Sequence, residues 1–418
     1  MSRIALAYGR GSFDFSFDDE RFAVVGETSD PNPPLSDFEV GVALDSPIGS
    51  PPIDEIVGSD DSVLIVASDA TRATASAQVV NLLVRRLIQA GVSPARVAVI
   101  FATGIHRPVT DKEKTELLSS FVTQRVQVLQ HDAYDGARLT TLGETASGLT
   151  VEVNSALKDY SHVFLTGGIT FHYFAGFTGG RKSICPGLAS AKTIEATHML
   201  ALDFEQGGRK AGVRAGALDG NAVHEECERV ASLVSPAFSI NAIVDENKRA
   251  VKMFCGDWRL AHRAGCRYYM DQHSVSIPEQ RDVVIVSCGG FPHDINLIQA
   301  HKALDMAALA CKEGGTIILL AECSDGLGRA DFLKWFDAGD SRALEARLRE
   351  GYEVNGQTAW ALLTKAERYR VCLISELPPE TVKKMRMVPV QTISEALESR
   401  DGFIMPRGAA VLPLLETK

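Results

Sequence analysis

The sequence lacks the features that mark several classes of protein. No run of basic residues reaches five, and 53 acidic against 43 basic residues give a formal net charge of -10, so nucleic acid is not an expected partner. No segment approaches the roughly 18 uninterrupted apolar residues of a membrane helix. The first residues turn polar without the apolar core and small-residue cleavage site of a secretory signal. We therefore expect a cytoplasmic protein that binds neither nucleic acid nor membranes.

The cysteines lack any zinc-binding or redox spacing. The chain has eight of them, scattered, with no CxxC motif and no Cys/His pattern of a zinc site. Reduced thiols in a cytoplasm are the simpler interpretation. Cys185 differs from the others because it lies in the segment that is richest in glycine and aromatic residues.

What the sequence does contain is a repeated alternation of buried strands and amphipathic helices. Short apolar runs rich in β-branched residues predict strands that are buried on both faces, and periodic apolar positions between them predict helices over 76–90 and 296–312. The predicted fold is α/β, with two domains, each a mainly parallel sheet flanked by helices, and with the active site in the interdomain cleft. We place the boundary near residue 270, which gives an N-terminal cofactor-binding catalytic domain over 1–270 and a C-terminal α/β domain over 271–418 that closes over the site. The predicted strands cover 63–67, 97–101, 162–165, 282–286 and 315–320.

Polar clusters follow these strands, at the edge of the sheet where ligands bind in α/β proteins. Ser68-Asp69-Ala70-Thr71-Arg72 follows the first, and the planar fork of Arg72 suits a carboxylate or phosphate. Ala102-Thr103-Gly104-Ile105-His106-Arg107-Pro108 follows the second, and His106 titrates in the range of a general base. Taken singly, these clusters are equally typical of a helix cap, a solvated arginine and an exposed histidine.

The third cluster, over 167–187, is far denser. It holds six glycines within 21 residues, interleaved with aromatic residues and followed by Arg181-Lys182-Ser183. Glycines such as Gly168, Gly179 and Gly180 permit close approach of the backbone to a bound group. The segment nearly matches a phosphate loop, but Arg181 stands where that pattern needs glycine, which disfavours an NTPase.

Two further elements carry candidate residues. His198 lies on a predicted helix that begins near Ala191, and a satisfied histidine at a helix surface is the alternative that spacing leaves open. A fourth junction, Cys288-Gly289-Gly290-Phe291-Pro292-His293-Asp294-Ile295-Asn296, starts a helix on which Gln299 and Lys302 share a face. By itself that pair is typical of a solvated stripe.

In this order the four junctions resemble the lactate racemase family, through the motifs SDATR, ATGxHRP, HYFAGFxGGRKSxxPG with a histidine in the following helix, and GGxPxDxNxxQxxK. The resemblance spans residues 60 to about 302 and extends plausibly to both domains. It implies a nickel-pincer nucleotide, Ni(II) pyridinium-3-thioamide-5-thiocarboxylic acid mononucleotide, covalently attached at Lys182. It also implies that His198 is the nickel ligand, and that His106 and His172 are the catalytic acid/bases. The implied cofactor loops include Asp69, Thr71, Gly168, Gly179 and Gly180, and the implied substrate-side residues are Arg72, Gln299, Lys302, Ile298 and Trp360.

The implied reaction is inversion at C2 of a small 2-hydroxy acid, with cofactor-making proteins as partners in maturation. Removing the C2 hydrogen as hydride avoids a carbanion, and two bases are expected because the enantiomers present their hydroxyls in different places. Ile298 stands where related lactate racemases often carry tyrosine, Thr170-Phe171 replaces Lys-Pro and Ile105 replaces threonine, so lactate is less firmly implied than the cofactor. Ile298 would admit a longer aliphatic or an aromatic side chain. Trp360 is a candidate second-domain contact, or a core tryptophan.

Two other classes stay open. A zinc-dependent hydrolase or lyase would use His106, His172 and His198 as ligands, although the sequence has no HExxH or other compact set. A protein that only binds the nickel nucleotide or a 2-hydroxy acid would not need two candidate bases.

Overall fold

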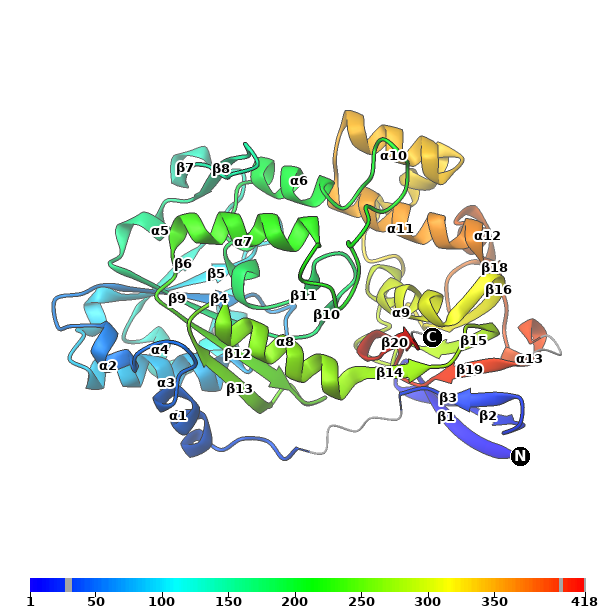
Figure 1. Cartoon of the computed structure of the whole chain (residues 1–418), viewed down its shortest axis with the longest axis horizontal. Coiled ribbons are helices and arrows are strands. Elements are labelled where there is room, and N and C mark those ends of the chain that lie inside the picture. Colours follow the sequence, from blue (N-terminus) through cyan, green and yellow to red (C-terminus); the bar gives the residue numbers. More distant parts are fainter. Residues whose placement is uncertain (27–31, 398–400, 417–418) are drawn as a thin grey trace. The chain divides into compact units, whose positions relative to one another are not determined.

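The computed structural model describes residues 1–26, 32–397 and 401–416, and the chain divides into two compact units, each visible in Figure 1. Unit 1 comprises Met1–Ser29, Leu202–Lys210 and Met270–Lys418, and unit 2 comprises Asp30–Ala201 and Ala211–Tyr269. The units are therefore discontinuous in sequence, whereas the sequence analysis drew a single boundary near residue 270. The physical reason is a strand pairing: β3 (Phe22–Val24) pairs with β19 (Gly402–Met405), which joins the start of the chain to the C-terminal sheet.

Unit 2 is built on a six-stranded sheet in the order β13-β12-β9-β4-β5-β6. All neighbouring strands are parallel except β12 and β13, which are antiparallel. Strand β4 is buried along almost its whole length, as a run of Val, Leu, Ile and Ala requires. The strands are β4 (Val63–Ser68), β5 (Val97–Ala102), β6 (Gln127–Gln130), β9 (His162–Gly168), β12 (Phe238–Val244) and β13 (Ala250–Gly256).

Helices lie on both sides of this sheet, with α3 and α4 against one face and α6 and α7 beyond the other (Figure 1). Helix α3 buries a continuous apolar stripe that includes Val80, Leu83 and Leu87. The helices of unit 2 are α1 (Asp37–Asp45), α2 (Ile53–Ile56), α3 (Ser76–Gln89), α4 (Asp111–Thr123), α5 (Ala156–Asp159), α6 (Ala191–Met199) and α7 (Ala222–Val234), and α8 (Leu260–His273) begins here and ends in unit 1. Two hairpins complete it, β7 (Leu139–Glu144) with β8 (Thr150–Asn154) and β10 (Phe171–His172) with β11 (Gly176–Phe177).

Unit 1 is built on a second six-stranded sheet, ordered β18-β17-β16-β15-β19-β3, in which every neighbouring pair is parallel. Its other strands are β15 (Arg281–Ser287), β16 (Cys311–Leu320), β17 (Arg370–Ile374) and β18 (Val388–Pro389), with the pairs β1 (Ser2–Tyr8) and β2 (Gly11–Phe17), and β14 (Ser274–Ile277) and β20 (Leu412–Leu415). Its helices are α9 (Leu297–Ala310), α10 (Ser341–Glu350), α11 (Val354–Arg368), α12 (Pro379–Lys384) and α13 (Ile393–Ala396).

The predicted fold class is confirmed: both units are α/β, with parallel-rich sheets flanked by helices. The helices predicted over 76–90 and 296–312 form as α3 and α9, each ending slightly earlier than predicted. Within the described ranges, no helix is long and apolar enough to cross a bilayer.

Candidate active site

The candidate site of unit 2 forms where three neighbouring strands end. Strands β9, β4 and β5 lie side by side and run parallel, so the loops that follow them share one edge of the sheet. Asp69 directly follows β4, His106 follows β5, and His172 follows β9. The three motifs that the sequence analysis singled out separately therefore start from one edge.

Asp69 and His106 form a hydrogen-bonded pair. Asp69 Oδ2 lies 2.7 Å from His106 Nδ1, and Oδ1 accepts from the backbone N–H and the hydroxyl of Thr71 at 2.9 and 2.5 Å. Burial would raise the pKa of Asp69, but the hydrogen bonds from His106 and Thr71 and the nearby charges outweigh it and hold this pKa below its ordinary value. A carboxylate only accepts, so the proton of neutral His106 sits on Nδ1 and the lone pair on Nε2. This geometry prepares His106 to take up a proton at Nε2.

His172 and Lys182 form the second pair. His172 lies in the hairpin of β10 and β11, and its Nε2 is 3.1 Å from Lys182 Nζ. The backbone N–H of Ala175 donates to His172 Nδ1 at 3.2 Å. Because a neutral imidazole carries one proton, a filled Nδ1 acceptor places that proton on Nε2, where it points to the amine of Lys182.

The pKa of Lys182 is held far below that of an ordinary lysine. Burial lowers its pKa to about 7, and the charges of Arg181 and Arg72 act in the same direction. Lys182 belongs to the 3-10 helix Gly180–Ser183, in which Arg181 and Ser183 are buried. A neutral amine is the form that acts as a nucleophile toward a carbonyl carbon.

His198 is buried on α6, with 6% of its surface exposed. Its Nδ1 donates to the carbonyl of Ile194 at 2.8 Å, which leaves the lone pair on Nε2. Burial, together with the charge of Lys182, lowers the pKa of His198 to about 3. The ring is therefore neutral at physiological pH, in the tautomer and second-nitrogen arrangement typical of a metal-ligating histidine.

The ring of Phe174 lies close to His172, His198 and Lys182. Its centroid lies 4.5 Å from that of His172 and 5.0 Å from that of His198. Lys182 Nζ lies 5.4 Å from the same centroid. One aromatic ring therefore contacts the candidate base, the candidate metal ligand and the amine.

Close packing within the protein requires glycine at three positions of the third motif. A Cβ on Gly168 would come within 2.6 Å of the carbonyl oxygen of Ala73. At Gly179, where φ is +80°, it would meet Asn241 Oδ1 at 2.9 Å, and at Gly180 it would meet the ring of His262 at 2.8 Å. Close internal packing accounts for these three glycines, and their contact with a cofactor stays a prediction.

Arg72 is exposed at the same edge, and in the described ranges its guanidinium has no ion-pair partner. A small hollow of about 210 Å³ lies beside His106, lined also by Ile105, Arg107, His131 and Tyr134. Arg72 is not among the residues that line this hollow, and its carboxylate role remains a prediction.

The remaining predicted residues belong to unit 1. Gln299 and Lys302 lie on α9 and bind each other, Lys302 Nζ donating to Gln299 Oε1 at 2.7 Å, so the shared face that spacing predicted is present. Ile298 is the neighbour of Gln299, and Trp360 on α11 is only 3% exposed, which fits the alternative of a core tryptophan. Their part in the site, like the shared cleft, stays a prediction.

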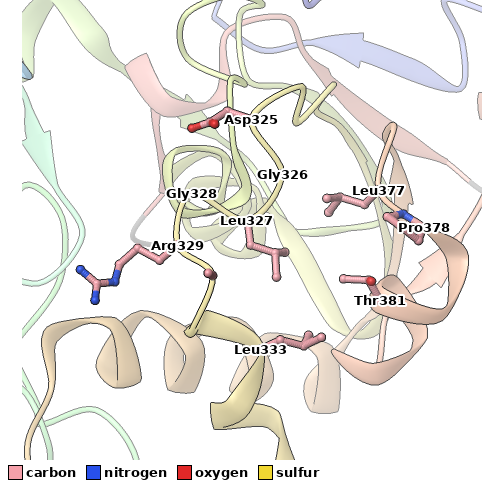
Figure 2. A pocket seen from close by; sticks show the side chains of 10 residues that line it. Asp325, Gly326, Leu327, Gly328, Arg329, Leu333, Leu377, Pro378 and Thr381 are labelled. Atoms are coloured by element: carbon pink, nitrogen blue, oxygen red, sulfur yellow. The ribbon is translucent and has the colours of Figure 1, made fainter.

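Unit 1 also has a larger pocket of about 450 Å³, shown in Figure 2. The loop from Asp325 to Ala330 and the side chains of Leu333, Leu377, Pro378 and Thr381 line it. None of the candidate catalytic residues is among them. Its lining combines glycine and aliphatic side chains with Asp325, Arg329 and Thr381.

The fold, the hydrogen-bonded pair of Asp69 and His106, and the group of His172, Lys182 and His198 around Phe174 define a two-domain α/β protein with acid/base groups at one sheet edge. Residues 8–208 match the lactate racemase N-terminal domain, and residues 277–411 match the lactate racemase C-terminal domain. The lactate racemase of Lactiplantibacillus plantarum is 31% identical over 99% of this chain and 100% of its own length. That of Thermoanaerobacterium thermosaccharolyticum is 29% identical over 97% of this chain and 95% of its own length.

A solved structure agrees. The lactate racemase apoprotein from Thermoanaerobacterium thermosaccharolyticum superposes with a TM-score of 0.88, at 27% identity, over 99% of this chain and 100% of that one. A Thermotoga maritima protein at 19% identity, with a TM-score of 0.69 over 92% of this chain and 99% of that one, shares the fold. The chain belongs to the lactate racemase family, and it is an isomerase of the racemase type.

Sequence reasoning missed three features of the site. Asp69 was assigned to a cofactor loop, although it also binds His106. Phe174 was read only as part of an aromatic motif, and its central position was not predicted. Asn221 had no role, yet it binds the backbone of the His172 hairpin. The signal for Asn221 in the sequence was an asparagine at the start of a helix.

Proposed function

We propose that this chain racemises lactate or a related short-chain or aromatic 2-hydroxy acid by hydride transfer to and from a nickel-pincer nucleotide. Lys182 carries the cofactor covalently, His198 is a nickel ligand, and His106 and His172 are the acid/bases. The observation that carries the proposal is the cluster of a neutral lysine, a lone-pair-bearing buried histidine and a candidate base around one phenylalanine ring.

The residues present fit such a cofactor. Burial lowers the pKa of Lys182 to about 7, so the neutral amine that formation of a thioamide requires is accessible at neutral pH. His198 offers an imidazole nitrogen with its tautomer set by the Ile194 carbonyl, and imidazole with soft sulfur ligands suits Ni(II). When bound, the cofactor supplies a hydride acceptor at its central carbon.

The two histidines supply the proton transfers. His106 holds a lone pair on Nε2 because Asp69 takes its Nδ1 proton, so it accepts the hydroxyl proton of one enantiomer. His172 would present its Nε2–H from a different loop, as the proton donor when the hydroxyl of the other enantiomer forms. Two groups on different loops would thus supply one proton acceptor and one proton donor.

Arg72 in unit 2 is the proposed partner of the substrate carboxylate, since its exposed guanidinium can bind both oxygens. Gln299 and Lys302 are proposed to contribute from α9. Ile298 has no hydroxyl and would accept a longer aliphatic or an aromatic side chain on the substrate.

A zinc hydrolase has less support. In the ranges that the structure describes, no three His, Cys, Asp or Glu side chains are gathered where they could hold a metal ion. The nickel cofactor would need only one protein ligand, because its sulfur arms and central carbon supply the others.

The deciding experiment is chiral chromatography with mass analysis of enantiopure 2-hydroxy acids incubated in D2O. The protein is first matured beside cofactor-making proteins, which are its proposed partners. Inversion with the C2 hydrogen retained supports internal hydride return and identifies the acid. Deuterium at C2 would mean proton abstraction and refute the hydride mechanism, and no inversion of any acid would refute the racemase proposal.

The roles of the two histidines are tested with the single variants His106→Gln and His172→Gln. Both variants keep Lys182 and His198. Either single variant is expected to lose turnover while keeping nickel and the covalent mass increment. A double variant that still inverted the acid would overturn the histidine roles.

A further inference from the structure

The hairpin that carries His172 is held from behind by two buried side chains that the proposed chemistry does not use. Asn221 is fully buried, and Arg181 is 1% exposed. Both donate to backbone carbonyls of the segment Phe174–Ala175. That segment is the one whose N–H group binds His172.

Asn221 acts on the peptide that faces His172. Its Nδ2 donates to the carbonyl of Phe174 at 3.0 Å, and the N–H of the same peptide unit, on Ala175, donates to His172 Nδ1 at 3.2 Å. Donation to a peptide oxygen polarises the N–H on its other side and strengthens what that N–H donates. Asn221 is itself fixed, because its Oδ1 accepts from Val223 and His224 at the start of α7.

Arg181 holds the next carbonyl. Its Nη2 donates to the oxygen of Ala175 at 2.7 Å, and its Nη1 lies 3.4 Å from the oxygen of Gly179. The two contacts join the end of the hairpin turn to the loop that carries Lys182. Residue Ala175 is therefore restrained on both sides, by Asn221 through the preceding carbonyl and by Arg181 through its own.

We propose that Asn221 and Arg181 are positioning residues that set the tautomer of His172. By holding Ala175 in place they keep its N–H on Nδ1, so that the proton of neutral His172 sits on Nε2 and points to Lys182 Nζ. The inference deepens the proposed function, on which it rests for the roles of His172 and Lys182. Burial and the charge of Arg181, which both lower the pKa of Lys182, act in the same sense by keeping its amine an acceptor.

The test uses the full chain without cofactor, labelled with ¹⁵N at histidine. The ring-nitrogen shifts of His172, assigned by their loss in His172→Gln, report which nitrogen carries the proton. In the unaltered chain we expect one tautomer with the proton on Nε2. In Asn221→Ser, which keeps a helix-capping oxygen but loses the donor to Phe174, we expect a mixture of the two tautomers.

Asn154→Ser is the matched control. Asn154 is also buried in unit 2, and its Oδ1 also accepts a backbone N–H two residues on, from Ala156 at 3.1 Å. It contacts His131 and not the hairpin. We expect a similar loss of thermal stability from both variants, but a change in the His172 signals only in Asn221→Ser. Equal changes in both variants, or none in either, would overturn the proposal.

Arg181→Met gives a second measurement. It removes the donor to the carbonyl of Ala175, so a mixture of the two His172 tautomers is expected in this variant as well. If Arg181→Met does not fold, Asn221→Ser alone carries the test, since it leaves the buried cation in place. A single His172 tautomer in folded Arg181→Met would remove Arg181 from the proposal.

Activity separates this inference from the proposed function. In the matured enzyme Asn221→Ser should lower kcat about fivefold to tenfold, the value of one hydrogen bond, with little change in KM. An enzyme with no racemase activity would refute the proposed function and leave the tautomer result standing. A full-strength enzyme with mixed tautomers would show that the positioning does not serve catalysis.

Discussion

Each unit holds one largely enclosed lysine, and the two lysines differ in their charged partners. In unit 1, Lys365 Nζ lies 2.5 Å from Asp305 Oδ1, and Arg209 reaches the same carboxylate at 2.9 Å. In unit 2, Lys182 has His172 as its neighbour, and no carboxylate pairs with it in the described part of the chain. The first lysine belongs to a compensated ionic cluster, and the second is an uncompensated amine.

The charges around each lysine account for this difference. Burial would raise the pKa of Asp305, but the charges of Arg209 and Lys365 reverse the effect and keep it ionised. Burial lowers the pKa of Lys182 to about 7, and Arg181 and Arg72 add to the effect. Burial lowers the pKa of Lys365 as well, but Asp305 opposes that shift, whereas in the described residues no carboxylate pairs with Lys182 to oppose it.

The largest effect is expected from Lys182→Met. Racemase activity should fall to background, and the covalent mass increment of the matured protein should disappear from its intact mass. The fold should be as stable as before or more so, because an uncompensated buried amine is removed. Measurable activity with noncovalent cofactor would show that the amine is not essential.

Lys365→Met sharpens the comparison as the matched substitution in the other unit. It leaves Asp305 buried with Arg209 as its remaining partner, so the free energy of unfolding should fall by about 3–5 kcal/mol. Urea unfolding measures this loss. The activity of the molecules that remain folded should change far less than in Lys182→Met, and the reverse ranking would break the comparison.

Asp69→Asn should have the next largest effect. An amide can donate to His106 Nδ1, which would move the histidine proton to Nε2 and remove the lone pair that accepts the hydroxyl proton. We expect kcat to fall about 10²-fold or more while the fold is retained. Thr71→Val is the control, since it removes one hydroxyl contact to Asp69 and keeps the carboxylate on His106. Equal losses in the two variants would contradict the role of Asp69 as the partner of His106.

Much of the fold and of the arrangement of the site could be predicted from the sequence. Runs of β-branched residues predicted β4, β5 and β9, and these strands are neighbours, so the loops that carry Asp69, His106 and His172 start from one edge of the sheet, as predicted. The neutral state of Lys182 could not be predicted, because it depends on which charges surround it after folding.

Contacts between distant segments account for what was missed. The pairing of β3 with β19, which moves the start of the chain into unit 1, joins Phe22 to Gly402, 380 positions apart. Asn221 meets Phe174 only because α7 packs near the 3-10 helix that holds Lys182. No local pattern records such contacts, since they depend on how the sheet orders its helices.

The last prediction concerns the pH dependence of stability that Lys182 contributes. Between pH 7 and 10.5 the unfolded chain binds a proton on this amine and the folded chain does not, so the free energy of unfolding rises with pH across that window. The burial cost is present in full below pH 7 and vanishes above 10.5. Urea unfolding of the cofactor-free chain and of Lys182→Met, at matched pH values, measures this contribution together with its effect on the thiols of Cys185 and Cys227, whose pKa values the charge of Lys182 lowers. A difference that stays flat from pH 7 to 10 would mean that Lys182 is charged in the folded chain, and the two buried lysines would then differ only in their partners.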